Sequence, residues 1–401
     1  MRGFEVLQRQ LCVGGIPLER LAHRAGQTPF YAYDRHMILR RVAEVRAVLP
    51  VGMHLHYAVK ANPMPALLSC LAPVVDGMDV ASGRELLAAL DAGCSPSSIS
   101  FAGPGKREGE LRQALAAGVL LHIESFRELD LLARLSAEMG LPARVAVRVN
   151  PDFELRGAGM RMGGGAQVFG VDLEQVPALL ARIAQTGLQF EGFHVYAGSQ
   201  VLKAELLAEL IDRSVSMLLQ LQAHLPGPVL QVNLGGGWGI PYFPNEQPLD
   251  VQPVRSALLA AQQRLHGQWP QARLVVELGR FLVAEAGVYV VRVLERKISR
   301  GEVFLVTDGG LHHHLAATGN FGQVLRRNYP VAVAQRADEP SLEQVSVVGP
   351  LCTPLDVLAH KVALPRAEAG DLVVIFQSGA YGATASPQAF LGHPPCVEIL
   401  V

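Results

Sequence analysis

The sequence contains little that would anchor it in a membrane or crosslink it. No run of 18 uninterrupted apolar residues occurs, and the opening MRGFEVLQRQLCVGGIPL lacks the apolar core of a signal peptide. The five cysteines are odd in number, scattered and without Cys-x-x-Cys spacing. This pattern argues against both a disulfide framework and a structural zinc site. We therefore expect a cytoplasmic protein with reduced thiols.

An excess of charge of either sign is also missing. Lys and Arg total 35 against 36 Asp and Glu, a formal net charge of −1, so we expect no basic surface for nucleic acid or anionic lipid. Half of the 401 residues are hydrophobic and 18% are charged, which is typical of a folded chain with a sizeable core. The expected partners are therefore small molecules.

The chain does contain a repeated unit. A short β-branched run ends in polar or glycine residues and is followed by an Ala/Leu-rich stretch with helical periodicity. Eight such runs predict strands at 53–62, 75–82, 97–105, 118–125, 143–152, 190–200, 230–237 and 272–280.

Eight strand–helix units favour an α/β fold with a (β/α)8 TIM barrel. An open, doubly wound sheet is the alternative. Its glycine-rich fingerprint would be expected on the first unit, whereas LGGGWG lies on the seventh.

After about residue 285 the pattern changes to strands separated by turns, with little helical periodicity between them. This predicts a smaller C-terminal antiparallel β-sandwich or barrel domain. The short apolar opening of the chain could join it. We therefore predict a barrel over 32–285 and a β domain made of 1–31 and 286–401.

Polar residues at the strand ends are the first candidates for chemistry, because such a barrel builds its active site there. Lys60 ends the first run, YAVKAN. A lysine at a strand end often only extends into solvent. Here its neighbours are small and it faces the barrel mouth, where partial desolvation favours an amine that acts as a nucleophile.

The last two strands end in residues suited to a phosphorylated cofactor. Backbone N–H groups of glycines can approach an anion closely, although a tight turn is equally consistent with them. Glu277 can keep a pyridine nitrogen protonated, and Arg280 can bind a phosphate or a substrate carboxylate; alternatively, the two could only pair with each other. The candidates here are Gly235, Gly236, Gly237, Glu277, Gly279 and Arg280.

The sixth run, HVYAGSQ, supplies an aromatic pair. Alternation places His194 and Tyr196 on one face, where they could pack in the core or stack on a flat cofactor ring. Ser199 is a further candidate for hydrogen bonding to phosphate.

Three more candidates and one rejected site lie in the predicted β domain. Cys352 and Asp356 occur in GPLCTPLD, where a lone cysteine is more often an inert apolar residue. Tyr381 in SGAYGA either forms a turn or contacts phosphate. His312–His314 are tempting metal ligands, but neighbours on one strand point to opposite faces, so we predict no metal site.

Taken together, these motifs resemble the fold-type III pyridoxal-phosphate decarboxylases, the group that contains diaminopimelate and ornithine decarboxylases. Single motifs are weak, but their order along nearly the whole chain is specific. The motifs that carry the resemblance are YAVKAN, GMDVASGREL, GPGK, IES, RVNPD, GSQ, LGGGWGI, ELGRFLVAEAG, DGG, GPLCTPLD and SGAYG.

The resemblance implies pyridoxal 5′-phosphate as cofactor, bound covalently to Lys60, with Glu277 at the pyridine nitrogen. It implies that Cys352 supplies a proton after CO2 departs and reaches the neighbouring subunit's site, so a two-fold dimer is expected. The implied phosphate contacts are Gly235–Gly237, Gly279, Arg280 and Tyr381, and the implied substrate contacts are Arg280, Asp356 and Tyr381.

Departures from the family pattern bear on the substrate. The diaminopimelate enzymes have a Glu after the catalytic Cys, which grips the distal end of the substrate; here that position is Thr353. Their Arg and Tyr after DGG have no secure counterpart in LHHHLAATGNFGQVLRRNYPV. The usual ring-stacking His falls on Tyr196, and Glu-Pro-Gly-Arg reads Glu-Leu-Gly-Arg.

CTPLD and HVYAGSQ are more similar to the branch that decarboxylates carrier-protein-linked glutamate, or to the exosortase-associated decarboxylases. The sequence thus predicts a decarboxylase of an amino acid or a derivative such as carrier-linked glutamate. Diaminopimelate decarboxylation is the alternative. An amino-acid racemase on the same fold is disfavoured because it usually has an Arg at the position of Glu277. A non-catalytic binding protein is disfavoured because Lys60, Glu277 and Cys352 are all retained.

Overall fold

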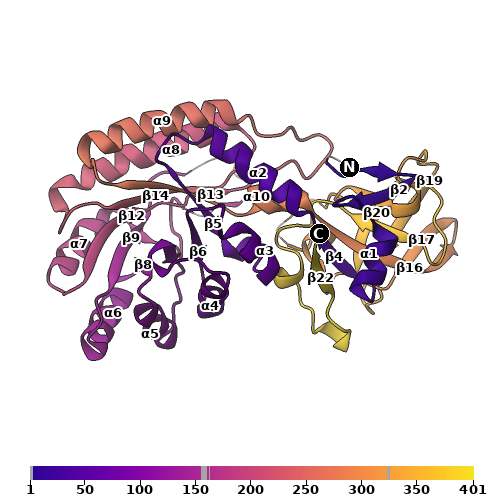
Figure 1. Ribbon diagram of the computed structural model, residues 1–401, viewed down its shortest axis with the longest axis horizontal. Helices are drawn as coiled ribbons and strands as arrows, with labels where there is room; N and C mark the ends of the chain where they lie inside the picture. The colour runs from indigo at the N-terminus through magenta and orange to yellow at the C-terminus, as the bar shows by residue number, and fades with distance from the viewer. Residues whose placement is uncertain (1–2, 155–159, 162, 322, 324–325) are drawn as a thin grey trace. The chain divides into compact units, whose positions relative to one another are not determined.

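The computed structural model describes residues 3–154, 160–161, 163–321, 323 and 326–401 (Figure 1). The chain forms two compact units. The first, called the barrel unit here, comprises Val42–Ile240 and Gln247–Gly279. The second, called the β unit, comprises Met1–Arg41, Pro241–Glu246 and Arg280–Val401. The division predicted from the sequence, with a barrel over 32–285, stays a prediction; the compact units change at Arg41 and Gly279 and assign 241–246 to the β unit.

In the described residues of the barrel unit, eight parallel strands close into a ring in which β15 pairs with β5 and β8 pairs with β9. Seven strands fall within predicted runs, and β12 begins one residue before its run, so the predicted barrel is confirmed. A short strand, β11 (Val171–Asp172), adds to β9 outside the ring. In ring order the strands are β5 (His54–Ala58), β6 (Gly77–Val80), β7 (Ile99–Phe101), β8 (Leu120–Ile123), β9 (Arg144–Asn150), β12 (Gln189–His194), β14 (Gln231–Gly236) and β15 (Arg273–Leu278).

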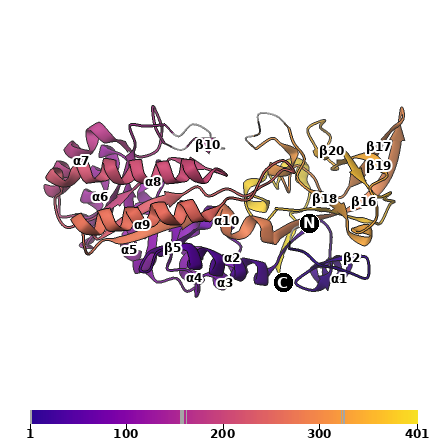
Figure 2. The same cartoon turned by 90° about the horizontal axis from the view of Figure 1, so that it is seen from above.

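Amphipathic helices surround the strands of this unit (Figure 1). Helix α6, for example, buries Leu129, Leu132 and Leu135, which recur at helical spacing, and Ser125 caps its first turn by accepting the Glu128 N–H. Helices α8 and α9 lie side by side (Figure 1, Figure 2). The helices are α3 (Pro65–Leu71), α4 (Gly83–Asp91), α5 (Glu108–Ala117), α6 (Phe126–Met139), α7 (Val176–Ala184), α8 (Ala204–Leu219) and α9 (Val251–Gln268).

The β unit is built on a sheet whose longest strand, β16 (Gly287–Ser299), pairs with β4, β17 and β21. We expected an antiparallel sheet, and most of its pairs are antiparallel. Two pairs are parallel, β17 with β19 and β4 with β22, so the sheet is mixed. The other strands of the sheet are β4 (Phe30–Tyr33), β17 (Glu302–Thr307), β18 (Val331–Val333), β19 (Glu343–Val348), β20 (Val357–Leu364), β21 (Leu372–Ile375) and β22 (Val397–Leu400).

The start of the chain also lies in the β unit. Strands β1 (Val6–Leu7), β2 (Gln10–Val13) and β3 (Ile16–Pro17) form a small antiparallel sheet that helix α1 (Leu18–Ala25) follows. Helix α2 (Arg35–Val48) then leads into the barrel unit, and α10 (Arg280–Val283) leads back from it. Among the described residues, no helix is both long and apolar enough to cross a membrane.

Candidate active site

Lys60 and Glu277 lie on neighbouring elements at the carboxyl ends of the barrel strands. Lys60 is in the 3-10 turn Val59–Ala61 that follows β5, and Glu277 is on β15, which pairs with β5. The lysine Nζ is 3.7 Å from Oε1 of Glu277, whose side chain is 5% exposed. Burial alone would raise the pKa of this carboxyl, but Lys60 and then His194 lower it to about 2. Glu277 is therefore a buried carboxylate anion.

The second oxygen of Glu277 faces His194. Its Oε2 lies 3.3 Å from Nε2 of His194, the last residue of β12. A second buried histidine, His122 on β8, packs against His194 with ring centroids 4.5 Å apart. Burial, followed by the neighbouring His194, lowers the pKa of His122 well below its usual value, so His122 is a neutral imidazole. His194 thus lies between the neutral ring of His122 and the carboxylate of Glu277.

Tyr196 follows β12 and lies beside Lys60. Its ring centroid is 4.9 Å from the Lys60 amine, so of the aromatic pair His194 and Tyr196 it is Tyr196 that is placed to stack beside a group bound to the lysine. The two rings meet edge to face, 6.4 Å apart. Ser199 lies in the short strand β13 (Gly198–Ser199) and is buried.

The glycine loop, Gly235–Gly237 at the end of β14, lies against the backbone of Glu277 and Gly198. Gly235 and Gly237 have φ of 69° and 77°, in the left-handed region that favours glycine. A Cβ on Gly236 would lie 1.9 Å from the carbonyl oxygen of Glu277, and one on Gly237 would lie 2.2 Å from that of Gly198. Only glycines therefore fit, and they set the loop beside Ser199.

Sequence reasoning missed a buried ion network at the ends of β7, β8 and β9. Lys106 Nζ, 1% exposed, lies 2.7 Å from Glu128 and donates to the carbonyl oxygen of His122. Arg148 Nη1 donates to both oxygens of Glu124, which also accept the N–H groups of Gly103 and Gly170. Three of these ions, Lys106, Glu124 and Arg148, lie at predicted strand ends in the motifs GPGK, IES and RVNPD. Their position at strand ends was the signal that could have predicted the network.

In the β unit, Arg280 lies between two tyrosines. Its Nη1 donates to the Tyr242 hydroxyl at 2.9 Å, and its guanidinium carbon lies 4.5 Å from the centroid of the Tyr381 ring. Tyr381 has φ of 53°, an uncommon conformation for a residue other than glycine. Arg280 and Tyr381, two of the predicted phosphate and substrate contacts, are thus brought together, while Tyr242 was not among the predicted residues.

The structure corrects the predicted role of Asp356. This carboxylate is 2% exposed and accepts the backbone N–H groups of Leu311 at 2.5 Å and Leu351 at 2.8 Å. It is packed so closely that a Cβ on Gly310 or Gly349 would collide with it. Asp356 therefore holds two loops of the β unit together and is not available to a substrate. Cys352, in the same loop, is exposed.

The reason given for rejecting His312–His314 as a metal site was wrong. Strand β17 ends at Thr307, and the histidines lie in a turn, not on a strand. His312 and His313 have rings 3.7 Å apart, while His314 Nε2 pairs with Ser378 Oγ at 2.8 Å. In the part of the chain that the structure describes, no group of three or more His, Cys, Asp or Glu side chains could hold a metal ion.

The barrel residues fit pyridoxal phosphate on three structural grounds. Lys60 offers an amine beside the Tyr196 ring, and Glu277 offers a buried anion suited to a protonated pyridine nitrogen. The glycine loop, which has no room for any Cβ, suits a phosphate. In addition, Nδ2 of Asn233 on β14 is buried without a partner among the described residues. A buried donor in this state is typical of a site that a ligand completes.

Comparisons with known proteins agree with this geometry. A family model described as "Pyridoxal-dependent decarboxylase, pyridoxal binding domain" matches residues 35–284. The chain is 38% identical to the L-glutamyl-[BtrI acyl-carrier protein] decarboxylase of Niallia circulans, over 93% of this chain and 89% of that protein. It is 33% identical to the diaminopimelate decarboxylase of Pseudomonas aeruginosa, over 95% and 89%.

Solved structures give the same result. The diaminopimelate decarboxylase from M. jannaschii in co-complex with L-lysine matches with a TM-score of 0.89 and 25% identity, covering 100% of this chain and 93% of that one. All three of these relatives are named as decarboxylases; two of the names give diaminopimelate as substrate and one gives a carrier-linked glutamyl group.

Proposed function

The chain belongs to the pyridoxal-dependent decarboxylases and decarboxylates an amino acid or an amino-acid derivative, and we propose that its substrate is a glutamyl group linked to an acyl-carrier protein. The observation that carries the substrate proposal is Thr353, where the diaminopimelate enzymes have a Glu. The 38% identity with a glutamyl-carrier decarboxylase supports it independently.

We assign the reaction to groups at the barrel strand ends. Pyridoxal phosphate, when bound, supplies an electron sink for the electron pair left behind as CO2 departs. Lys60 would anchor the cofactor through its amine, beside the ring of Tyr196. Glu277, an anion held by His194, keeps a proton on the pyridine nitrogen. The glycine loop and Ser199 bind the phosphate, as does Arg280.

Cys352 completes the proposed chemistry by giving a proton to the substrate carbon that has lost CO2. Its thiol is exposed in the β unit, in a loop that Asp356 fixes by accepting the Leu351 N–H. We propose that the enzyme is a two-fold dimer in which this loop serves the partner's active site, as the resemblance implies. An exposed but rigidly held thiol is suited to such a shared site.

The substrate argument depends on charge. Free diaminopimelate ends in a second ammonium and carboxylate, and burying such a charge without a partner is costly. Thr353 has no charge, and its hydroxyl already accepts the N–H of Leu355 at 3.3 Å. A carrier-linked glutamyl group has no charge at its distal end, because its side-chain carboxyl is joined to the carrier. Thr353 is compatible with such a substrate.

CO2 release from the purified protein with added pyridoxal phosphate tests the proposal. Candidate substrates are L-glutamyl-carrier protein, free L-glutamate and free diaminopimelate. We expect kcat/KM for the carrier-linked substrate to exceed that for diaminopimelate by at least about a hundredfold. Thr353→Glu should narrow this gap, because it restores a distal anion. Efficient turnover of free diaminopimelate by the unaltered protein would refute the substrate proposal and leave the decarboxylase assignment intact.

A further inference from the structure

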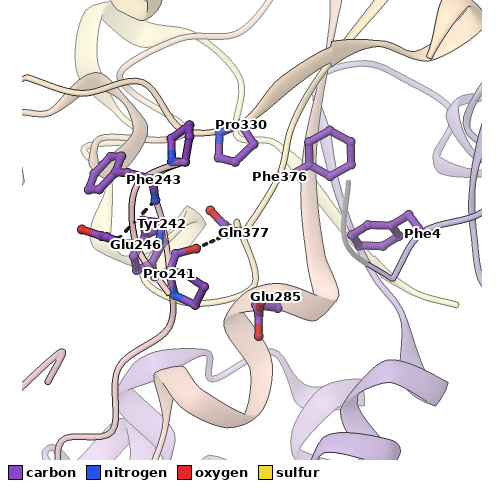
Figure 3. A pocket seen from close by; sticks show the side chains of 10 residues that line it. Phe4, Pro241, Tyr242, Phe243, Glu246, Glu285, Pro330, Phe376 and Gln377 are labelled. Atoms are coloured by element: carbon purple, nitrogen blue, oxygen red, sulfur yellow. Dashed lines mark hydrogen bonds between the residues drawn. The ribbon is translucent and has the colours of Figure 1, made fainter. Parts of the chain in front are cut away.

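A cavity of about 240 Å³ lies within the β unit, and none of the predicted site residues line it (Figure 3). Its walls are mostly aromatic rings and prolines, and all three chain segments that make up the β unit contribute to them. The principal wall residues are Phe4, Pro241, Tyr242, Phe243, Pro330 and Phe376. Such a lining suits an organic group and not a hydrated ion.

The two carboxylates on the cavity wall are already paired. Glu246 lies 3.2 Å from Arg327 and also accepts the N–H groups of Tyr242 and Phe243. Glu285 lies 2.5 Å from Arg41. Among the described lining residues, therefore, a charged ligand of either sign meets no unpaired opposite charge, and the cavity favours an uncharged one.

One lining residue offers an unused hydrogen-bond acceptor. Gln377 donates through Nε2 to the carbonyl oxygen of Pro241, while its Oε1 is buried and has no partner among the described residues. Figure 3 shows the amide directed into the cavity. Leaving a buried acceptor unpaired is unfavourable, so the site is completed by a ligand that donates a hydrogen bond. The φ of 56° at Gln377 is a further mark of a functional position.

The cavity adjoins Arg280 through Tyr242. The ring of Tyr242 lines the cavity, and its hydroxyl accepts the hydrogen bond from Arg280. The segment Phe376–Tyr381 makes a second connection, because it begins on the cavity wall and ends at Tyr381, against which Arg280 packs. Both of its strained residues, Gln377 and Tyr381, point to ligand-facing roles.

We propose that this cavity binds the pantetheine arm by which a carrier protein holds the substrate, with an amide N–H of the arm donating to Gln377 Oε1. Pantetheine is an uncharged, flexible chain with two amide groups and a branched aliphatic part. It therefore matches the neutral charge, the aromatic walls and the unpaired acceptor. This inference rests on the proposed function, since only a carrier-linked substrate has such an arm.

The test compares L-glutamyl-S-pantetheine with L-glutamyl-carrier protein as substrates of the holoenzyme, and measures the binding of pantetheine alone by titration calorimetry. Gln377→Met removes the acceptor but keeps the side-chain length. We expect it to raise KM for both thioesters, and Kd for pantetheine, about three- to tenfold, the loss expected for one neutral hydrogen bond. The effect on kcat should be smaller. Phe390→Ala, an exposed aromatic of the β unit outside the cavity, is the matched control.

The outcomes distinguish a failure of the cavity proposal from a failure of the proposed function. Suppose that the thioesters are turned over but Gln377→Met leaves KM unchanged, or that pantetheine does not bind. Either result would overturn the cavity proposal and leave the substrate proposal standing. If no glutamyl thioester releases CO2, the proposed function fails first and the cavity proposal with it. If Gln377→Met does not fold, Phe243→Ala, which widens the cavity, should give the same rise in KM, and an unchanged KM there would overturn the inference.

Discussion

One buried titratable group from each compact unit shows how burial and a nearby charge compete. In the barrel unit, Glu277 is buried yet stays charged, because Lys60 lies 3.7 Å away and lowers its pKa to about 2. In the β unit, His314 is buried yet stays neutral, because burial lowers its pKa to about 3 and no charge among the described residues offsets this. The position of an opposite charge, and not burial, decides the result.

This difference corresponds to what each unit contributes. Charges fixed inside the barrel are available for binding a polar cofactor and for stabilising charge during a reaction. In the β unit, buried hydrogen-bond acceptors hold the loops together: His314 accepts from Ala317, and the Asp356 carboxylate accepts from Leu311 and Leu351. The barrel unit thus supplies the buried Lys60–Glu277 ion pair, whereas the β unit supplies hydrogen-bonded loops and a neutral cavity.

Removing the Lys60 cation should produce the largest loss of activity. Lys60→Ala is expected to lower kcat/KM more than about a thousandfold, because it deletes the proposed nucleophile. It should also abolish the visible absorbance of the lysine-bound cofactor and raise the pKa of Glu277. Absorption spectra check the loss of the lysine-bound cofactor, and CO2 release checks the loss of activity. A variant that keeps the yellow colour would show that another residue anchors the cofactor.

Removing the Glu277 anion should produce the next largest loss of activity. Glu277→Gln keeps the shape but leaves the pyridine nitrogen without a counter-charge, and we expect kcat to fall about a hundredfold or more.

The same variant tests stability in the cofactor-free protein. The folded pKa of Glu277, about 2, is below its ordinary value of 4.5, so the carboxylate contributes stability above pH 4.5 that is lost as pH falls toward 2. That shift corresponds to about 3 kcal/mol. The difference in unfolding free energy between the parent and Glu277→Gln should therefore shrink as pH falls through this window. A difference independent of pH would show that Glu277 is not charged when folded.

How far the sequence alone leads also differs between the units. All eight barrel strands were predicted, because a run of buried β-branched residues ending in Gly or polar residues is a local signal. Lys60, Glu277 and the glycine loop were found from the same strand ends. The pairing of Lys106 with Glu128 was not, since it joins residues of consecutive strand–helix units that meet only when β7 and β8 pair.

The β unit was harder to predict for a physical reason. Asp356 was expected to contact substrate because the family resemblance implied it. Its burial depends on two loops, at Leu311 and Leu351, that approach it only after folding. The parallel pairing of β17 with β19 depends likewise on a long connection whose course no local pattern encodes.

Cys352 tests whether the β unit takes part in the chemistry at all. We expect Cys352→Ala to lower kcat about a hundredfold, the typical contribution of a general acid, while the cofactor absorbance is kept. Mixing it with Lys60→Ala provides a sharper test. If each site combines Lys60 of one subunit with Cys352 of the other, random mixed dimers should recover about a quarter of the parent activity. No recovery after subunit exchange would contradict a shared site.

The smallest effect is expected from replacing His314, the neutral buried histidine of the β unit. It concerns the pH dependence of the free energy of unfolding. The folded pKa of His314, about 3, lies below its ordinary value of 6.5. The unfolded chain therefore binds a proton before the folded one does, and stability present above pH 6.5 is lost as pH falls below it. Between pH 6.5 and 5.5 one such histidine contributes a slope that averages about 1 kcal/mol per pH unit, because the unfolded imidazole is only partly protonated there. His314→Asn should remove that slope from unfolding free energies measured between pH 6.5 and 5.5, a window in which Glu277 stays fully charged. An unchanged slope would mean that His314 is not neutral in the folded β unit, and that the two units do not differ as their geometry indicates.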